Sequence, residues 1–179
     1  MFGGIAGEAA GKVVSCEYNG NILIENCQKV MMGGIAGYFQ GDYISECVNR
    51  GGRVIKVPDD CSYISCGGIA YEWDNGGNVT NCKNYADITL EGNLEKISKL
   101  NGEIFVGGIA AEVWGGSIHN CINYGNIKVS NCYINRIDKF GCNGISGGGL
   151  NGTELSNIDA SDGNQNNGTI EKNIEEMSS

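Results

Sequence analysis

A short glycine-rich phrase recurs along this chain and restricts its fold more than any other feature of the sequence. Gly-Gly-Ile-Ala begins at Gly3, Gly33, Gly67 and Gly107, and a degenerate copy, Asn-Gly-Ile-Ser, begins at Asn143. Successive copies start 30, 34, 40 and 36 residues apart, and a period of this size is typical of solenoid proteins. Each unit of a solenoid packs mainly on its neighbours, so we expect residues 1–179 to form a single elongated domain.

Each copy continues into the same arrangement of apolar residues, cysteine and turn residues. A cysteine follows the first glycine by 13 to 15 residues, at Cys16, Cys47, Cys82 and Cys121, and Ile158 takes this position in the last copy. An apolar residue precedes each of these positions by three, and a small residue followed by a β-branched one comes after each cysteine. Apolar stretches this short, separated by glycine and asparagine, are typical of β-strands joined by turns.

The repeat therefore predicts an all-β protein. We expect a right-handed parallel β-helix of about five coils, each of roughly 23 residues with three short strands. Strands of neighbouring coils would pair at a spacing of about 4.8 Å, so that equivalent residues lie in columns. The extra residues of the longer repeats would emerge at one corner, before each glycine phrase. No segment before residue 168 shows the periodicity of a helix.

Residues 168–178 differ from the repeats because they suit a short helix. Ile170, Ile174 and Met177 would share one helical face, and Thr169 would be the N-cap. Such a helix would cap the open C-terminal end of the stack, whose strand edges otherwise lack partners. No comparable cap precedes the first repeat, so we expect the N-terminal coil to be exposed or to be covered by a partner, as in an oligomer.

The nine cysteines favour a structural role. The four that share one position would form a column of buried, reduced thiols, because a spacing of about 4.8 Å exceeds the roughly 3.8 Å between the Cβ atoms of a disulfide. No Cys-x-x-Cys pair occurs, and the single histidine, His119, would point outward by strand alternation. We therefore expect no metal, no cofactor, no nucleophile–base pair and no enzymatic activity.

Acidic and aromatic side chains recur at two outward positions of the expected coils. Glu8, Glu72 and Glu112 share a position with Tyr38, and Trp73 and Trp114 follow within two residues. The other position holds Tyr85 and Tyr124. Exposed aromatic residues beside acids are typical of surfaces that bind a sugar or a protein, whereas a charged strand edge is otherwise only solvated. These residues are candidate binding residues, and both interpretations stay open.

The charge of the chain is negative and uneven. Its net charge is −9, and six acids but one base lie from residue 154 onwards. The acidic candidates for a second binding surface are Asp159, Asp162, Glu171, Glu175 and Glu176. Acids repel phosphates, so we expect no direct binding of nucleic acid, although an acidic surface suits the basic channel of an enzyme. The sequence has no apolar run of 18 residues, so we expect no membrane span.

The detailed pattern of the repeat resembles a known family. The sequence from Gly116 reads Gly-Ser-Ile-His-Asn-Cys-Ile-Asn-Tyr-Gly-Asn-Ile, and the segment from Gly67 to Ile88 is nearly as close to the family pattern. This pattern is similar to the GLUG-type glycine-rich repeats of bacterial adhesin-like surface proteins, over residues 3–158. The resemblance implies a β-solenoid that serves as a spacer or a binding surface. The His-Glu-x-x-His motif of the metalloproteases that also carry such repeats is not present in the sequence.

Two functions remain open from the sequence. The first is a non-catalytic, adhesin-like module that binds a protein or a glycan through its outer face. The second is a small acidic inhibitor from a phage or mobile element, anti-CRISPR-like or mimicking nucleic acid, that blocks the basic channel of an enzyme. A fragment of a larger adhesin would lie at the cell surface. A complete chain would be cytoplasmic, since no signal peptide is visible at Met1.

Overall fold

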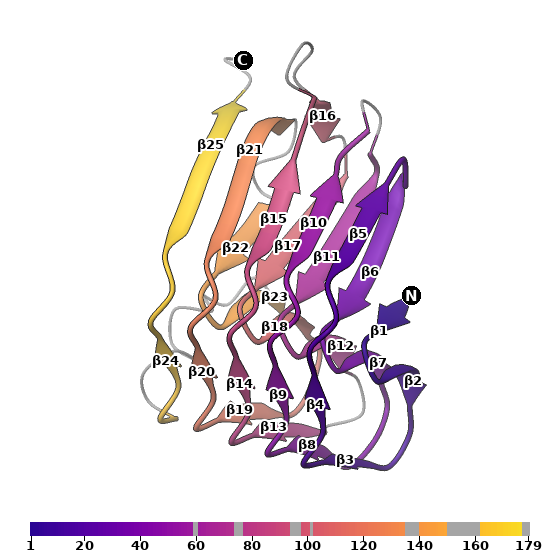
Figure 1. Ribbon diagram of the computed structural model, residues 1–179, viewed down its shortest axis with the longest axis vertical. Helices are drawn as coiled ribbons and strands as arrows, with labels where there is room; N and C mark the ends of the chain where they lie inside the picture. The colour runs from indigo at the N-terminus through magenta and orange to yellow at the C-terminus, as the bar shows by residue number, and fades with distance from the viewer. Residues whose placement is uncertain are drawn as a thin grey trace.

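The computed structural model describes residues 1–58, 61–73, 77–93, 98–100, 102–134, 140–149 and 162–176. In these ranges the protein is all-β, and its strands form five sheets in which every pair runs parallel. Figure 1 shows successive turns of the chain side by side, from β5 on one flank to β25 on the other. The predicted all-β, parallel, solenoid-like architecture is therefore confirmed.

Two of the sheets enclose the upper part of each coil. Sheet A contains β1 (Phe2–Gly3), β6 (Lys29–Gly33), β11 (Tyr63–Gly67), β17 (Glu103–Gly107) and β22 (Phe140–Asn143). Sheet E contains β5 (Ile22–Glu25), β10 (Arg53–Lys56), β15 (Ile88–Glu91), β21 (Ile127–Ile134), β16 (Ser98–Leu100) and β25 (Ile170–Glu176). The segments that join sheet E to the next strand of sheet A carry the extra residues of the longer repeats, as the sequence predicts.

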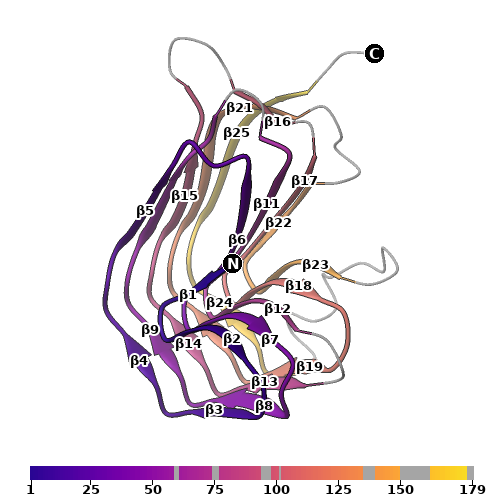
Figure 2. The same cartoon turned by 90° about the vertical axis from the view of Figure 1, so that its right-hand side faces the viewer.

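The other three sheets enclose the lower part of each coil. Sheet B contains β2 (Ala6–Ala9), β7 (Ala36–Phe39), β12 (Ala70–Trp73), β18 (Ala110–Val113) and β23 (Ser146–Gly149). Sheet C contains β3 (Lys12–Val14), β8 (Tyr43–Ser45), β13 (Asn78–Thr80) and β19 (Ser117–His119). Sheet D contains β4 (Glu17–Tyr18), β9 (Val48–Asn49), β14 (Lys83–Asn84), β20 (Ile122–Asn123) and β24 (Gln165–Asn166). Figure 2 shows the resulting two-lobed outline.

The coil has five short strands, so the expected number of three is wrong. The extra corner between sheets C and D lies one residue before each column cysteine. There the backbone is left-handed, with φ between 51° and 57°, at Ser15, Glu46, Asn81 and Asn120. Left-handed φ is common for asparagine but not for glutamate, which occupies this corner in the second coil. The corner was therefore not recognised in the sequence, which suggested one strand where the structure has a strand of sheet C and a strand of sheet D.

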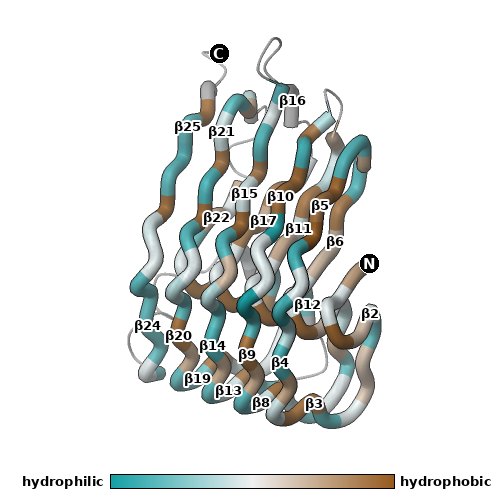
Figure 3. Tube along the Cα trace, in the orientation of Figure 1, coloured by the Kyte–Doolittle hydropathy of each residue, from teal (hydrophilic) through white to brown (hydrophobic). Residues whose placement is uncertain are grey.

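Two hydrophobic cores run through the stack. One lies between sheets A and E and the other inside sheets B, C and D. Figure 3 shows hydrophobic segments recurring on neighbouring strands, as stacked equivalent residues require. The walls meet between the cores at a waist, where an added Cβ on Gly68 or Gly108 would lie 2.6 Å or 2.4 Å from the Cγ of Asn84 or Asn123. The second glycine of the phrase is thus required for this close approach.

A ladder of asparagine side chains, three buried and the last exposed, follows the waist. Asn49 Nδ2 donates to Asn84 Oδ1 at 2.7 Å, and Asn84 Nδ2 donates to Asn123 Oδ1 at 2.8 Å. Asn123 Nδ2 donates to Asn166 Oδ1 at 2.8 Å. The Nδ2 groups of Asn84 and Asn123 also donate to a carbonyl two residues later, so these amides satisfy their own chain as well as the next coil.

The two ends of the stack differ from the expectations. Residues Ile170–Glu176 form a strand paired with β21, so the predicted capping helix is wrong over these residues. The spacing of Ile170 and Ile174 suits a strand equally well, and the edge of β21 offers the backbone partners that decide between them. At the other end Ile5 and Phe2 are exposed, as expected of an uncapped first coil. Ile158 and Met177 lie outside the described residues.

The column of cysteines agrees with the sequence prediction except at its first member. All nine cysteines are free thiols, and Cys47, Cys82 and Cys121 are buried. Cys16 is only partly buried because it belongs to the end coil. Cys47, Cys82 and Cys121 each donate to the carbonyl two residues earlier, at 3.2–3.4 Å. The thiols therefore act as small core side chains with satisfied donors.

We expect a thiol reagent to distinguish one cysteine from the rest in the native protein. Cys27 is exposed, whereas burial raises the pKa of Cys66, Cys132 and Cys142 to about 11 and keeps these thiols from forming the reactive thiolate. Titration near neutral pH should give one fast thiol, and titration in denaturant without reductant should give nine. A Cys27→Ser variant is the control, and rapid reaction of several thiols in that variant would contradict the buried column.

Candidate functional site

The predicted acidic and aromatic strip lies along the outer side of sheet B. The strand register places Glu8, Tyr38, Glu72 and Glu112 next to one another in successive coils. Their environments differ, because Glu8 is exposed while Glu112 has only 2% of its surface exposed. The shared position was therefore predicted correctly, but the burial of one member was not.

Glu112 is held by donors from sheet A and from the residue that follows its own strand. Its Oε1 accepts hydrogen bonds from the hydroxyls of Tyr63 and Ser65, the latter at 2.7 Å, and its Oε2 accepts from Trp114 Nε1 at 3.1 Å. Tyr63 also lies 3.2 Å from the hydroxyl of Tyr71. Burial is the main cause that raises the pKa of Tyr63 and of Tyr71 above that of a free tyrosine, so both remain protonated donors near neutral pH.

This network positions Trp114 at the surface. The indole remains 41% exposed although its Nε1 is fixed by the buried carboxylate. The sequence did not point to Tyr63, Ser65 or Tyr71, because they are far from Glu112 in the chain. The backbone of Trp73 pairs with Phe39 and Val113, and its side chain lies outside the described part.

Tyr85 and Tyr124 form a second surface, directly after strands β14 and β20 of sheet D. Their rings are stacked, with centroids 4.7 Å apart and planes within 5°, as their shared position in the repeat predicts. The guanidinium of Arg50 covers the other face of Tyr85 at 4.5 Å and is held by Glu17 at 3.0 Å. Both rings keep large exposed surfaces. We call Tyr85 and Tyr124 the tyrosine ridge.

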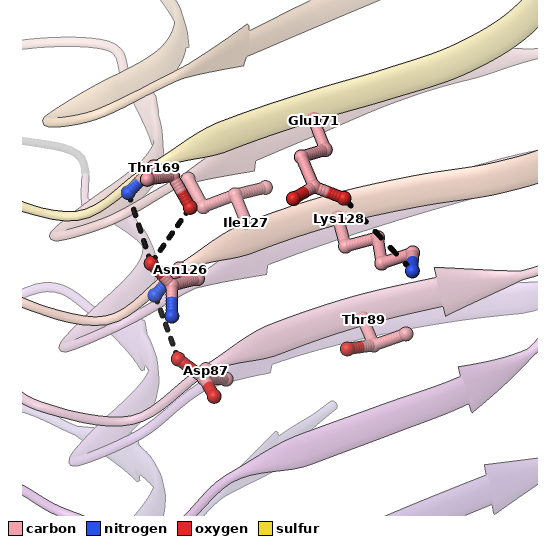
Figure 4. A pocket seen from close by; sticks show the side chains of 7 residues that line it. All are labelled: Asp87, Thr89, Asn126, Ile127, Lys128, Thr169 and Glu171. Atoms are coloured by element: carbon pink, nitrogen blue, oxygen red, sulfur yellow. Dashed lines mark hydrogen bonds and ion pairs between the residues drawn. The ribbon is translucent and has the colours of Figure 1, made fainter.

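Two residues after the ridge, at the start of sheet E, polar side chains form a second row. This polar ladder consists of Asn21, Asp87, Asn126 and Thr169. Asp87 Oδ1 accepts from the backbone N of Asn126 at 2.7 Å, and Asn126 Oδ1 accepts from the backbone N and the hydroxyl of Thr169 at 3.0 and 2.8 Å. Figure 4 shows these three side chains in a row, with Thr89, Lys128 and Glu171 beside them.

Two adjoining hollows lie along the polar ladder on sheet E. The first has a volume of about 220 Å³ and is lined by Asp87, Thr89, Asn126, Lys128 and Glu171, among others (Figure 4). The second has a volume of about 510 Å³ and shares Asp87 and Thr89 with the first. Together they form a shallow groove that follows the stack for several coils, which we call the ladder groove.

The acidic C-terminal candidates are not gathered on one surface. Asp162 lies 3.8 Å from half-buried His119, whereas Glu171 lies in the ladder groove, 3.9 Å from Lys128. Glu175 and Glu176 belong to β25, but the structure does not describe their side chains, and Asp159 lies outside the described residues. Of these acids, the described part brings only Glu171 to a second candidate surface.

Within the described ranges, no three His, Cys, Asp or Glu side chains are arranged to hold a metal ion. The same part of the chain contains no helix long and apolar enough to cross a membrane. The features that the geometry does offer are the exposed tyrosine ridge, the polar ladder and the ladder groove on sheet E. Comparison with known protein families, with characterised proteins and with solved structures finds no match to this chain.

Proposed function

We propose that this chain is a non-catalytic, adhesin-like binding module that takes a glycan along the tyrosine ridge and the ladder groove. In this proposal it is a right-handed β-solenoid of about five coils, built from repeats of the GLUG type. The observation that carries the function is the stacked, exposed pair Tyr85–Tyr124 beside a row of hydrogen-bonding side chains.

A glycan suits this combination of groups. A sugar ring has apolar C–H surfaces, which pack on aromatic carbon, and hydroxyls, which bond to carboxylate, amide and hydroxyl groups. The ridge supplies the first kind of contact, and Asp87, Asn126 and Thr169 supply the second. These side chains are fixed by bonds between coils, so little side-chain freedom is lost when a ligand binds.

The residues of the groove favour binding over turnover. Its lining contains amide, hydroxyl and aliphatic side chains with two carboxylates, Asp87 and Glu171. It also contains the cations Lys128 and Arg53, and it includes no histidine, cysteine or serine among the described residues. Asp87 is engaged by the backbone N of Asn126, and Glu171 is near Lys128. The proposal therefore assigns the carboxylates to recognition of ligand hydroxyls.

We expect Tyr124→Ala to weaken glycan binding by about tenfold or more, because it removes the ring whose outer face is not covered by Tyr85. A glycan array would first identify a ligand, and calorimetry would then measure its affinity for the wild type and the variant. Trp114→Ala is the matched control, since Trp114 is about as exposed as Tyr124. Trp114 is fixed by Glu112 of sheet B and does not belong to the tyrosine ridge or the ladder groove.

The same titrations separate the proposal from a protein or nucleic-acid-mimic role. Glycan affinity should change little between about 0.05 and 0.5 M salt, because neutral sugars release no counterions. A partner that is lost with Trp114→Ala but not with Tyr124→Ala would move the binding surface to sheet B. Binding to a basic protein that falls steeply with salt would instead support the acidic inhibitor, in accord with the net charge of −9.

A further inference from the structure

The polar ladder lacks a side chain at one rung. Gly52 lies between Asn21 and Asp87 in the column, because Arg53, the next residue, pairs with both Ile22 and Ile88. The backbone N of Gly52 donates to Asn21 Oδ1 at 3.0 Å, but no side chain continues the ladder to Asp87. The larger hollow of the ladder groove, about 510 Å³, lies at this rung.

The fold does not require glycine at this position. An added Cβ on Gly52 would lie 3.6 Å from Asn21 Oδ1 and 3.9 Å from the carbonyl oxygen of Asp87, which are ordinary contacts. On the preceding residue, Gly51, the same atom would lie 1.8 Å from the carbonyl oxygen of Gly20. The fold therefore requires glycine at Gly51 but not at Gly52. We call the position at Gly52, where the polar ladder has no side chain, the open rung.

The groups around the open rung complement an amide that carries a methyl group. Leu23, 60% exposed, and Val54 give the hollow an apolar floor. Asn21 uses its Oδ1 within the ladder, and its Nδ2 donates to no described residue. Asp87 uses its Oδ1, and its Oδ2 accepts from none of the described residues. The rung thus offers a donor at one end, an acceptor at the other and an apolar surface beneath.

We propose that the open rung at Gly52 binds the acetamido group of a 2-acetamido sugar. Asn21 Nδ2 donates to the acetamido carbonyl, Asp87 Oδ2 accepts from its N–H, and the methyl group packs on Leu23 and Val54. A single amide already bridges residues two coils apart in the asparagine ladder, where Asn84 accepts from Asn49 and donates to Asn123. The ligand amide then takes the place of the missing ladder side chain.

This inference rests on the proposed glycan function and names its ligand. The neighbouring hollow shares Asp87 and Thr89 with the open rung, so the next sugar along a linear chain would lie against Asn126, Lys128 and Thr169. The tyrosine ridge borders the same side of the stack. These adjoining groups favour a sugar over the other common source of an amide, an asparagine side chain in a peptide.

The test compares chitotetraose with cellotetraose, which share one β-linked backbone but differ in the acetamido group. We expect the wild type to bind chitotetraose about tenfold more tightly, because a site built for hydrogen bonds discriminates against a ligand without them. Gly52→Asn places an amide in the rung and should abolish this preference. Gly52→Ala is the control for the backbone, and Asp87→Asn removes the acceptor while retaining the Oδ1 bond within the ladder.

Equal affinity for the two tetrasaccharides in the wild type, or a preference that persists in Gly52→Asn, would overturn the inference. Tyr124-dependent binding of glycans without acetamido groups would leave the proposed function in place while rejecting this ligand. In Tyr124→Ala, N-acetylglucosamine alone should still shift the Gly52 amide resonance, and absence of that shift counts against the rung itself. Equal or better competition by blocked asparagine would assign the rung to a peptide and reject the sugar.

Discussion

Gly68→Ala is expected to destabilise the protein by about 3 kcal/mol or more, because the added methyl group has no space at the waist. Its Cβ would lie 1.8 Å from the carbonyl oxygen of Gly108 and 2.6 Å from the Cγ of Asn84. These atoms belong to two different walls, so no single rotamer change relieves both contacts. Relief requires the walls to separate, and the Asn84 ladder bonds of 2.7 and 2.8 Å are then lost.

Urea unfolding monitored by circular dichroism measures this change. Gly52→Ala is the matched control, since its Cβ meets nothing closer than 3.6 Å and its stability should change by less than about 1 kcal/mol. If Gly68→Ala unfolded at the same urea concentration as the wild type, the result would contradict the close approach of the two walls at the waist. The asparagine ladder would then not separate two cores.

Arg53→Ile is expected to stabilise the protein by about 1–4 kcal/mol, as replacement of buried charge by well-packed apolar side chains often does. Arg53 is 1% exposed and occupies a column that holds isoleucine in the other coils, at Ile22, Ile88, Ile127 and Ile170. Its Nη2 donates to the carbonyl oxygen of Gly68 at 3.1 Å, whereas Nε and Nη1 have no partner among the described residues. Burial lowers the pKa of Arg53.

The control for Arg53→Ile is Arg50→Ile in the same coil. Arg50 is exposed and pairs with Glu17 at 3.0 Å, so its loss should change the free energy of unfolding by less than about 1 kcal/mol. Equilibrium unfolding in urea compares the two variants directly. If Arg53→Ile were less stable than the wild type, interactions inside the stack would have to offset the cost of burying the guanidinium. The expected stabilisation would then be wrong.

The repeat predicted which residues lie in the same column of the stack, because the same sequence pattern sets the strand register in every coil. Ile64, for example, pairs with Val30 and Ile104, as equivalent positions of a parallel solenoid must. The number of sheets was not predictable in the same way, since the corner before Cys47 is made by Glu46 with φ of 57°. The strand at residues 170–176 was missed because Ile170 and Ile174 fit both periodicities and only the edge of β21 distinguishes them.

Contacts of the candidate site between residues that share one repeat position were predictable from the sequence. Contacts between residues of two different repeat positions were not. Tyr85 and Tyr124 share a repeat position, and their stacking follows directly from the coil spacing. The burial of Glu112 depends on Tyr63 and Ser65, which a different sheet brings to it. The open rung at Gly52 could have been found by comparing the residues before Ile22, Arg53, Ile88 and Ile127, because only one of them lacks a side chain.

The asparagine ladder has a direction, and this gives the stack a modular length. Each interior asparagine donates a hydrogen bond to the asparagine of the following coil and accepts one from that of the preceding coil. Every interior coil therefore makes the same two bonds to its neighbours. A whole repeat with the same asparagine can be inserted or deleted there without leaving a buried amide unpaired. The series stops at the first coil, where Tyr18 stands opposite Asn49 in place of an amide. Chain growth by duplication of interior repeats is therefore the change in length that this architecture tolerates most easily.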